Sequence, residues 1–215
     1  MHEICSMSVL VVSATALEIE PFLAIHPDAD YLITGVGLSS ALYHLTKRIH
    51  QFDYDMVLQV GLAGTFNDHL KFGTAVVVQK DRFADLGIWQ NQKVISVYDL
   101  GLSDPNEFPF QEGWLINNQS DKIAVNSIFA NALTVNLLTD DDVYIKAMKM
   151  KFNADIESME GAALHFICLQ EKIPFLQIRG ISNKVGERDK SKWNVKDAIY
   201  ASNQLLSEIY QSLKK

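Results

Sequence analysis

A carboxylate and an amide stand at the ends of two apolar segments between residues 157 and 193. Glu160 precedes the small residues of an apolar helical pattern, and Asn183 ends the apolar run PFLQIRGIS. A fixed carboxylate can accept hydrogen bonds from the hydroxyls of a ribose, and an Asn side chain can both donate to and accept from a purine edge. The simpler alternatives are an acid that stabilises a helix start and an Asn that shapes a turn. Together the two residues predict a site that holds a nucleoside.

Two more carboxylates, Glu18 and Glu20, follow the first apolar run of the chain. Both fall in the first turns of an expected helix, where the helix dipole favours negative charge. From the residues alone, neither acid is favoured as a catalytic group. Arg179 lies inside the run that ends at Asn183, and we expect it to form a structural ion pair that holds the site.

Two glycine clusters, at residues 35–37 and 61–64, each follow a strand-like run. Either could be a plain turn or, because α/β sheets bind ligands at the carboxyl ends of their strands, a wall of the substrate site that includes Gly64. The first cluster is not a dinucleotide fingerprint, since Ser40 stands where the third glycine is required. The sequence also lacks a P-loop and a GxSxG nucleophile turn. We therefore expect no cofactor.

Short apolar runs alternate with helical patterns along the chain, which is typical of an α/β fold. Six apolar runs predict strands, at residues 8–13, 31–34, 56–60, 75–78, 133–137 and 175–181, and several of them are rich in Val and Ile without polar alternation, which is typical of strands buried on both faces. Apolar residues at helical spacing predict helices at 38–50, 141–151, 159–169 and 195–213. The segment 81–119, rich in Asp, Gly, Pro and aromatic residues, predicts long loops that contain one hairpin. We expect a single α/β domain over residues 1–215, with a central mixed, mainly parallel sheet flanked by helices.

Composition and charge exclude several classes of partner. The chain has 215 residues and a net charge of -7, whereas nucleic acids and anionic membranes require a basic footprint. No apolar run reaches the roughly 20 residues of a membrane helix. The apolar run at 8–16 follows Glu3 rather than a Lys or Arg, so it predicts a strand rather than a signal peptide, and we expect a cytoplasmic protein. Cys5 and Cys168 are expected to be reduced core residues, and the His and Cys spacings predict no metal site.

The motifs resemble those of the nucleoside phosphorylase and nucleosidase superfamily along nearly the whole chain. SATALEIEPF, ITGVGLSSA and QVGLAGTF are similar, in order, to the acid motif and glycine turns of bacterial 5′-methylthioadenosine/S-adenosylhomocysteine nucleosidases, and MEGAA and RGISN are similar to their ribose and purine motifs. The resemblance implies that Glu18 activates water and that Met159 and Glu160 bind the ribose. It also implies a homo-oligomer, a dimer or larger.

One position departs from those adenine-releasing enzymes, which carry Asp where this chain has Asn183. That Asp protonates the purine, which Asn cannot do, and phosphorylases specific for 6-oxopurines use Asn near this place. We therefore expect a hypoxanthine-based substrate. The segments ISNKVGERDKSKW and GLSDPNEFPF are similar to those of futalosine hydrolases, relatives in the menaquinone pathway that release hypoxanthine from futalosine.

In this interpretation, Phe108 and Phe110 pack on the aromatic group at the 5′ end of the substrate, or else form the core of their own loop. Arg188 or Lys184 binds the distal carboxylate, although Arg188 could instead pair with Asp189. Hydrolysis is favoured over phosphorolysis, because the N-terminal loops lack the Arg that holds phosphate in the phosphorylases and Glu18 would repel phosphate. Two alternatives stay open: another purine nucleosidase of the same fold, including one for 5′-methylthioadenosine/S-adenosylhomocysteine, and a non-catalytic nucleoside-binding protein.

Overall fold

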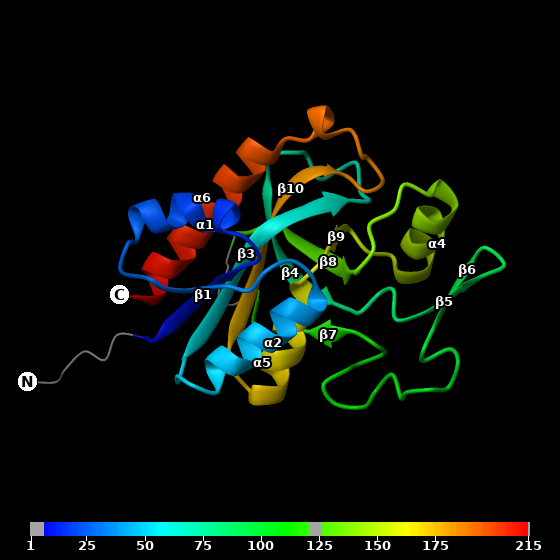
Figure 1. Ribbon diagram of the computed structural model, residues 1–215, viewed down its shortest axis with the longest axis horizontal. Helices are drawn as coiled ribbons and strands as arrows, with labels where there is room; N and C mark the ends of the chain where they lie inside the picture. The colour runs from blue at the N-terminus through cyan, green and yellow to red at the C-terminus, as the bar shows by residue number, and fades with distance from the viewer. Residues whose placement is uncertain (1–6, 121–125, 215) are drawn as a thin grey trace, which may run out of the picture.

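The computed structural model describes residues 7–120 and 126–214 (Figure 1). Its large sheet contains β1 (Val9–Ser13), β2 (Asp30–Ile33), β3 (Met56–Thr65), β4 (Ala75–Asp81), β7 (Leu115–Ile116), β8 (Phe129–Thr134), β9 (Ile156–Ser158) and β10 (Phe175–Lys184). A separate hairpin joins β5 (Gly87–Gln90) to β6 (Lys93–Ser96). The helices are α1 (Ala16–Ile25), α2 (Leu38–Ile49), α4 (Asp142–Phe152), α5 (Gly161–Glu171) and α6 (Val195–Leu213), with a 3-10 turn η1 (Lys190–Lys192).

Part of the large sheet closes on itself. β10 pairs in parallel along one edge of β3, while β1 and β9 share the other edge, β1 at its first half and β9 at its end. β10 continues to β4, β4 to β8, and β8 to β9. The strands β3, β10, β4, β8 and β9 therefore form a ring, from which β1 and β2 extend as an open wing. The expected mixed, mainly parallel sheet is confirmed, whereas its closure was not predicted.

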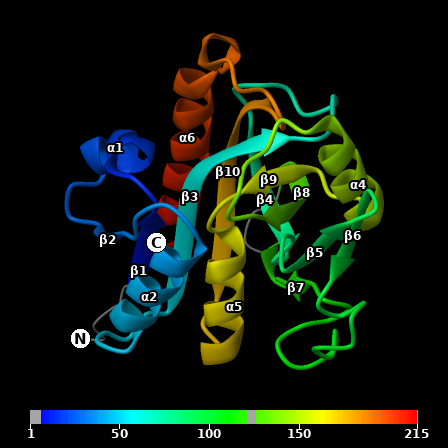
Figure 2. The same ribbon diagram turned by 45° about the vertical axis from the view of Figure 1, so that its right-hand side comes forward.

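Helices cover both faces of the open wing, as Figure 2 shows, with α1 beside α6 and α2 beside α5. The side chains of β1 alternate between these layers. Val9 and Val11 pack in the core that contains α1 and α6, and Leu10 and Val12 in the core that contains α2 and α5. A strand buried on both faces has no polar alternation, which is why β1 is apolar throughout. The N-termini of α1 and α5 thus reach the carboxyl edge of the sheet from opposite faces.

The strand expected at residues 133–137 is misplaced, because β8 already ends at Thr134. The Oγ1 of Thr134 donates to the buried Asp81 carboxylate (2.9 Å) and accepts from the Ala162 N–H (2.8 Å), and the chain then leaves the sheet. Leu137 is consequently 76% exposed. An apolar run does not by itself say which of its residues belongs to the strand.

Other boundaries differ less from the expectations. The single hairpin expected within 81–119 is present as β5 and β6, while the short β7 and β9 were not predicted. The helix expected from residue 159 begins at Gly161, and β3 and β10 extend further than expected, to Thr65 and Lys184. Cys168 is free and buried, as expected, whereas Cys5 lies outside the described residues. Within the described ranges, no helix is both long and apolar enough to cross a membrane.

Candidate active site

A cavity of about 640 Å³ opens at the carboxyl ends of β1, β3, β9 and β10. Most residues that the sequence analysis singled out for the site line it, and they come from segments far apart in the chain: Glu18, Gly64, Met159, Glu160, Asn183 and Arg188. The carboxyl edge of a largely parallel sheet is where α/β proteins bind ligands, because strand ends and helix N-termini meet there. This cavity is therefore the candidate active site.

Glu18 is held at the start of α1 with its carboxylate facing the cavity. Its Oε2 accepts from the N–H and the hydroxyl of Thr15 (3.1 and 2.8 Å), and its Oε1 accepts from the Leu62 N–H (3.0 Å). The bonds to Thr15 are those of a helix cap, so Glu18 does stabilise the start of α1, as the simpler alternative expected. However, the bond to β3 also fixes the carboxylate against the cavity wall. Glu20 is exposed and does not line the cavity, so the structure distinguishes the two acids.

Glu160 precedes α5, but its side chain makes no capping hydrogen bond to that helix. Its Oε1 instead accepts from the Gly37 N–H (2.9 Å), and its Oε2 lies 3.8 Å from Nη1 of Arg179. Burial raises the pKa of Glu160, while Arg179 and the Gly37 N–H act to lower it. The ion pair expected for Arg179 is thus present, with a second bond from Nη2 to the Gln59 side chain (2.9 Å). The first glycine cluster is both a turn and a part of the site.

The second glycine cluster, residues 61–64, lies inside β3. The alternative that it is a plain turn is therefore wrong. A Cβ on Gly61 would stand 2.4 Å from Nη1 of Arg179 and 3.2 Å from Oε1 of Glu18. A Cβ on Gly64 would stand 3.4 Å from Nδ2 of Asn183. The two glycines are three residues apart, which is roughly 10 Å along a strand. The carboxylates therefore gather at one end of this glycine segment and the amide at the other, as a sugar and its base would require.

Asn183 lies in β10, directly after a bulge, and not in a turn as the alternative expected. Its Oδ1 accepts from the Ser182 hydroxyl (2.7 Å), and its Nδ2 donates to the Lys184 carbonyl (2.8 Å). These two bonds orient the amide and leave one N–H donor and one acceptor lone pair free for a ligand. Asn183 is 9% exposed, so both would act in a largely desolvated site.

The small residues after Glu160 are explained by a buried polar cluster under α5. A Cβ on Gly161 would stand 2.0 Å from Nε2 of Gln177 and 2.2 Å from Oδ2 of Asp81. Burial raises the pKa of Asp81 to about 6. The groups packed closely against this turn are therefore side chains of β4 and β10, which leave no room for a larger residue at position 161.

The remaining candidates lie at the rim or outside the cavity. Arg188 is exposed and donates to the Thr139 carbonyl (3.3 Å), while Asp189 caps η1 instead of pairing with Arg188. Phe110 packs among the rings of its surroundings, with centroids about 6 Å apart, as loop core. Phe108 is 62% exposed. Neither Phe lines the cavity formed by this chain.

Glu157 lines the same cavity but was missed in the sequence analysis. It is the middle residue of β9 and only 8% exposed. Burial raises its pKa to about 7, with nearby Arg188 opposing the rise and Asp85 adding to it. An acid in the motif IESMEG, one residue after an apolar position, was the available signal. A three-residue strand is too short to show any periodicity, so its buried face could not be assigned.

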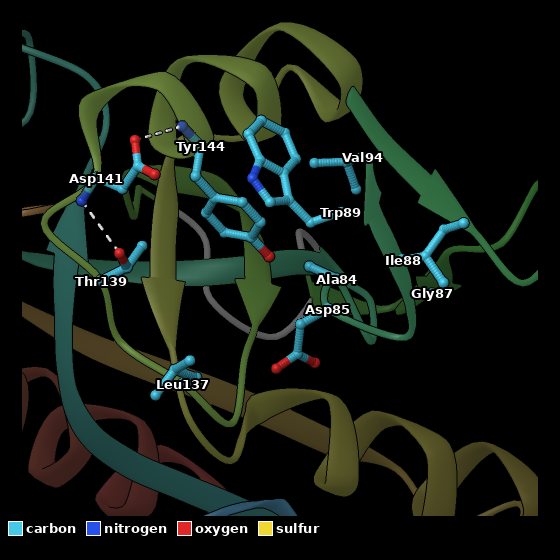
Figure 3. A pocket seen from close by; sticks show the side chains of 10 residues that line it. All are labelled: Ala84, Asp85, Gly87, Ile88, Trp89, Val94, Leu137, Thr139, Asp141 and Tyr144. Carbon is cyan, nitrogen blue, oxygen red and sulfur yellow. Dashed lines mark hydrogen bonds between the residues drawn. The ribbon is translucent and has the colours of Figure 1, made fainter. Parts of the chain in front are cut away.

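A second cavity of about 410 Å³ lies between the β5–β6 hairpin, α4 and the loop after β8 (Figure 3). The rings of Trp89 and Tyr144 meet there edge to face, with centroids 5.0 Å apart. The Asp141 carboxylate in its wall caps α4, and the Asp141 N–H donates to Thr139 Oγ1. Its walls are mainly apolar, and the polar groups in it mostly build the start of α4. We therefore place the chemistry in the first cavity.

The model of the Phosphorylase superfamily matches residues 18–214 of this chain. The chain belongs to this superfamily. Futalosine hydrolase of Thermus thermophilus is 30% identical over 210 residues, covering 89% of this chain and 90% of that protein. The expected resemblance, and with it the expectation of an enzyme, is confirmed.

Solved structures of the superfamily share the fold. The 5′-methylthioadenosine/S-adenosylhomocysteine nucleosidase of Helicobacter pylori, in complex with butyl-thio-DADMe-Immucillin-A, has a TM-score of 0.81 at 15% identity and covers 97% of this chain and 99% of its own. Futalosine hydrolase of Helicobacter pylori has a TM-score of 0.79 at 15% identity, covering 96% of this chain and 98% of its own. At this identity, the likeness establishes the fold alone.

Proposed function

We propose that this protein hydrolyses futalosine to hypoxanthine and dehypoxanthine futalosine, a step of menaquinone biosynthesis. The observation that carries the proposal is the amide of Asn183, held in the same cavity as Glu18 and Glu160, where an adenine-releasing enzyme has an acid. The 30% identity to a futalosine hydrolase over nearly the whole chain supports the same substrate.

The charges of the site suit the bond that must break. Cleavage of C1′–N9 leaves positive charge on the ribose, which the buried Glu160 carboxylate would stabilise while it binds the hydroxyls. Glu18 would take a proton from water as the water oxygen bonds to C1′, a transfer typically worth 10²- to 10⁴-fold in rate. Asn183 would donate its free N–H to the departing base, which receives its proton from solvent.

Water is favoured over phosphate as the nucleophile. Arg179 is buried against Glu160 and Gln59, so its charge is already paired. Among the described residues that line the cavity, the Arg and Lys side chains are Arg188 and Lys190, both on the loop after β10. A phosphate ion attacking C1′ would therefore meet the Glu18 carboxylate without a neighbouring cation.

The substrate's 5′ end is assigned less directly. Arg188 remains our proposed partner for the distal carboxylate, because it is exposed at the rim of the cavity. Phe108 and Phe110 remain proposed contacts of the aromatic group. Since neither lines this chain's cavity, such a contact requires the loop to move or a second copy of the chain to supply it.

A nucleosidase for 5′-methylthioadenosine is the second candidate, favoured by the sequence likeness to the 5′-methylthioadenosine/S-adenosylhomocysteine nucleosidase of Buchnera aphidicola, which is 28% identical over 186 residues. The deciding experiment is an assay without phosphate, in which futalosine, inosine and 5′-methylthioadenosine are each incubated with the protein and the free base is measured by chromatography. We expect hypoxanthine from futalosine and no adenine. Adenine from 5′-methylthioadenosine as the main product would replace our proposal with the second candidate.

A further inference from the structure

A row of three buried polar side chains lies beneath α5 and has no part in the proposed reaction. Asp81 of β4, Gln177 of β10 and His165 of α5 are each fully buried. Nε2 of Gln177 and Oδ2 of Asp81 face one point, since they stand 2.0 and 2.2 Å from the place that a Cβ on Gly161 would take. Burial lowers the pKa of His165, while a contact with the Gln177 amide acts to raise it, so the imidazole adjoins that amide. Its Nδ1 lies 3.0 Å from the Leu115 carbonyl oxygen, which ends the row.

This buried row has three contacts but too few hydrogens to fill them. The contacts join the Leu115 carbonyl to the imidazole, the imidazole to the Gln177 amide, and the amide to Oδ2 of Asp81. A neutral imidazole supplies one hydrogen, the amide presents its N–H group to one side only, and an ionised carboxylate supplies none. Within residues 7–120 and 126–214, Oδ2 of Asp81, Nε2 of His165 and both polar atoms of Gln177 have no hydrogen-bond partner. One added proton, on Asp81 or on His165, allows all three contacts to become hydrogen bonds.

The environment of the row favours the proton on Asp81. Burial, which penalises charge, raises the pKa of Asp81 to about 6 and lowers that of His165 to about 4. The charged group that faces both is Arg179 of β10, which adds to the effect of burial on His165 and only partly offsets it on Asp81. β7 and β8 face Asp81 with Leu115 and Thr134, which carry no charge. Between these two pKa values, Asp81 is protonated and His165 is neutral.

Asp81 also reaches the candidate active site through its second oxygen. Oδ1 of Asp81 accepts from the Thr134 hydroxyl (2.9 Å), whose oxygen accepts from the Ala162 N–H (2.8 Å). That N–H is one of the first four of α5, which have no partner inside the helix. Glu160 directly precedes α5 and gives it no capping bond. The start of α5, and with it Glu160, is therefore held from β4 and β8, and an ionised Asp81 would also compete with Glu160 for Arg179.

We propose that Asp81 is a positioning residue, which in its protonated form donates to Gln177, keeps the start of α5 in place and so fixes Glu160 for the ribose. Gln177 then donates to Nε2 of His165, and the Nδ1–H of His165 donates to the Leu115 carbonyl. This inference rests on the proposed nucleosidase function and specifies what holds its ribose-binding carboxylate. Loss of the proton leaves two acceptors in contact beneath α5, a buried mismatch that a shift of the helix start would relieve.

Asp81→Asn tests this inference, because its amide supplies the missing hydrogen at every pH while its oxygen still accepts from Thr134. Single-turnover cleavage of futalosine would be measured from pH 5 to pH 8 on the wild type and the variant. We expect the rate of the variant relative to the wild type to rise with pH through about 6, by up to about 100-fold, since a small misplacement of a catalytic group can cost that much. Other titrating groups, such as Glu157, are common to both proteins and cancel. Asp28→Asn, which changes an exposed acid before β2, is the control and should give a flat ratio.

Urea unfolding of the same proteins gives a second readout that needs no activity. The folded pKa of Asp81 lies above its unfolded value of 3.8, so the stability due to its protonated form is lost as pH rises through about 6. The folding equilibrium constant of Asp81→Asn relative to the wild type should therefore grow about 100-fold between pH 4 and pH 8. A rate ratio that stays constant while the stability ratio grows would overturn the positioning role, and two constant ratios would overturn the protonation as well.

Nitrogen-15 NMR of the His165 ring in the wild-type protein at pH 5 keeps the inference testable if Asp81→Asn does not fold. We expect a neutral ring with its hydrogen on Nδ1, whereas a doubly protonated ring would place the proton on His165 and overturn the role of Asp81. A wild-type protein that cleaves no nucleoside would refute the proposed function and with it the positioning of Glu160. The unfolding and NMR results would still decide where the proton lies, so the two failures are distinguishable.

Discussion

Replacing Glu157 with Gln should stabilise the protein at neutral and alkaline pH and have much less effect in acid. The pKa of Glu157 is raised from 4.5 to about 7 in the folded protein, mainly because burial penalises the charged form. Between these two values the folded state binds more protons than the unfolded state. The free energy of unfolding therefore falls as pH rises through this window, and the contribution of a protonated Glu157 is lost above pH 7.

The size of the effect follows from the pKa difference. One pKa unit corresponds to 1.36 kcal/mol, so a change from 4.5 to about 7 is worth about 3 kcal/mol of stability. A Gln at this position is uncharged at every pH, so its contribution to the free energy of unfolding does not change with pH. The gain in stability of Glu157→Gln over the wild type should hence grow by about 3 kcal/mol between pH 4 and pH 8.

Urea unfolding at pH 4, 5.5, 7 and 8 would measure this gain. Asp81, with its pKa raised to about 6, and His165, with its pKa lowered to about 4, also make stability depend on pH, but both are common to the two proteins and cancel in the difference. Glu208→Gln, an exposed acid of α6, is the control and should show a flat difference. A difference for Glu157→Gln that is the same at pH 4 and pH 8 would refute the reasoning.

Three further outcomes are expected. Glu18→Gln should lower the rate constant for futalosine cleavage, measured in a single-turnover assay, by about 10²- to 10⁴-fold. Glu20→Gln is the control and should cleave at the wild-type rate. A wild-type rate for Glu18→Gln would exclude Glu18 as the base. Asn183→Asp supplies an acid for the purine, so in the base-release assay it should raise adenine release from 5′-methylthioadenosine relative to hypoxanthine release, and an unchanged ratio would contradict this role. Gly161→Ala should cost about 1–3 kcal/mol of stability, because its Cβ would stand 2.0 Å from Gln177, and an unchanged urea midpoint would show that α5 can shift at no cost.

Residue types and spacing predicted much of the fold and part of the candidate site. α6 was placed at its observed bounds and α2 to within one residue, because apolar positions at helical spacing mark a buried stripe. Strand ends were less certain, since an apolar run such as the one around Leu133 continues past the last paired residue. Glu160 and Asn183 were selected because each stands at an element boundary near the sheet edge.

The sequence by itself determined the α/β fold class, because local periodicity depends only on which faces of an element are buried. It also indicated a site with carboxylates and an amide, because those residues stand at the boundaries of the expected elements. The resemblance had already favoured Glu18 over Glu20, whereas only the tertiary structure placed Glu157 in the wall of the cavity. The tertiary structure also placed Asn183, Gly64 and Glu157 in one row and closed the sheet into a ring. Such pairings join residues far apart in the chain, and their register is set by the packing of whole strands rather than by local sequence.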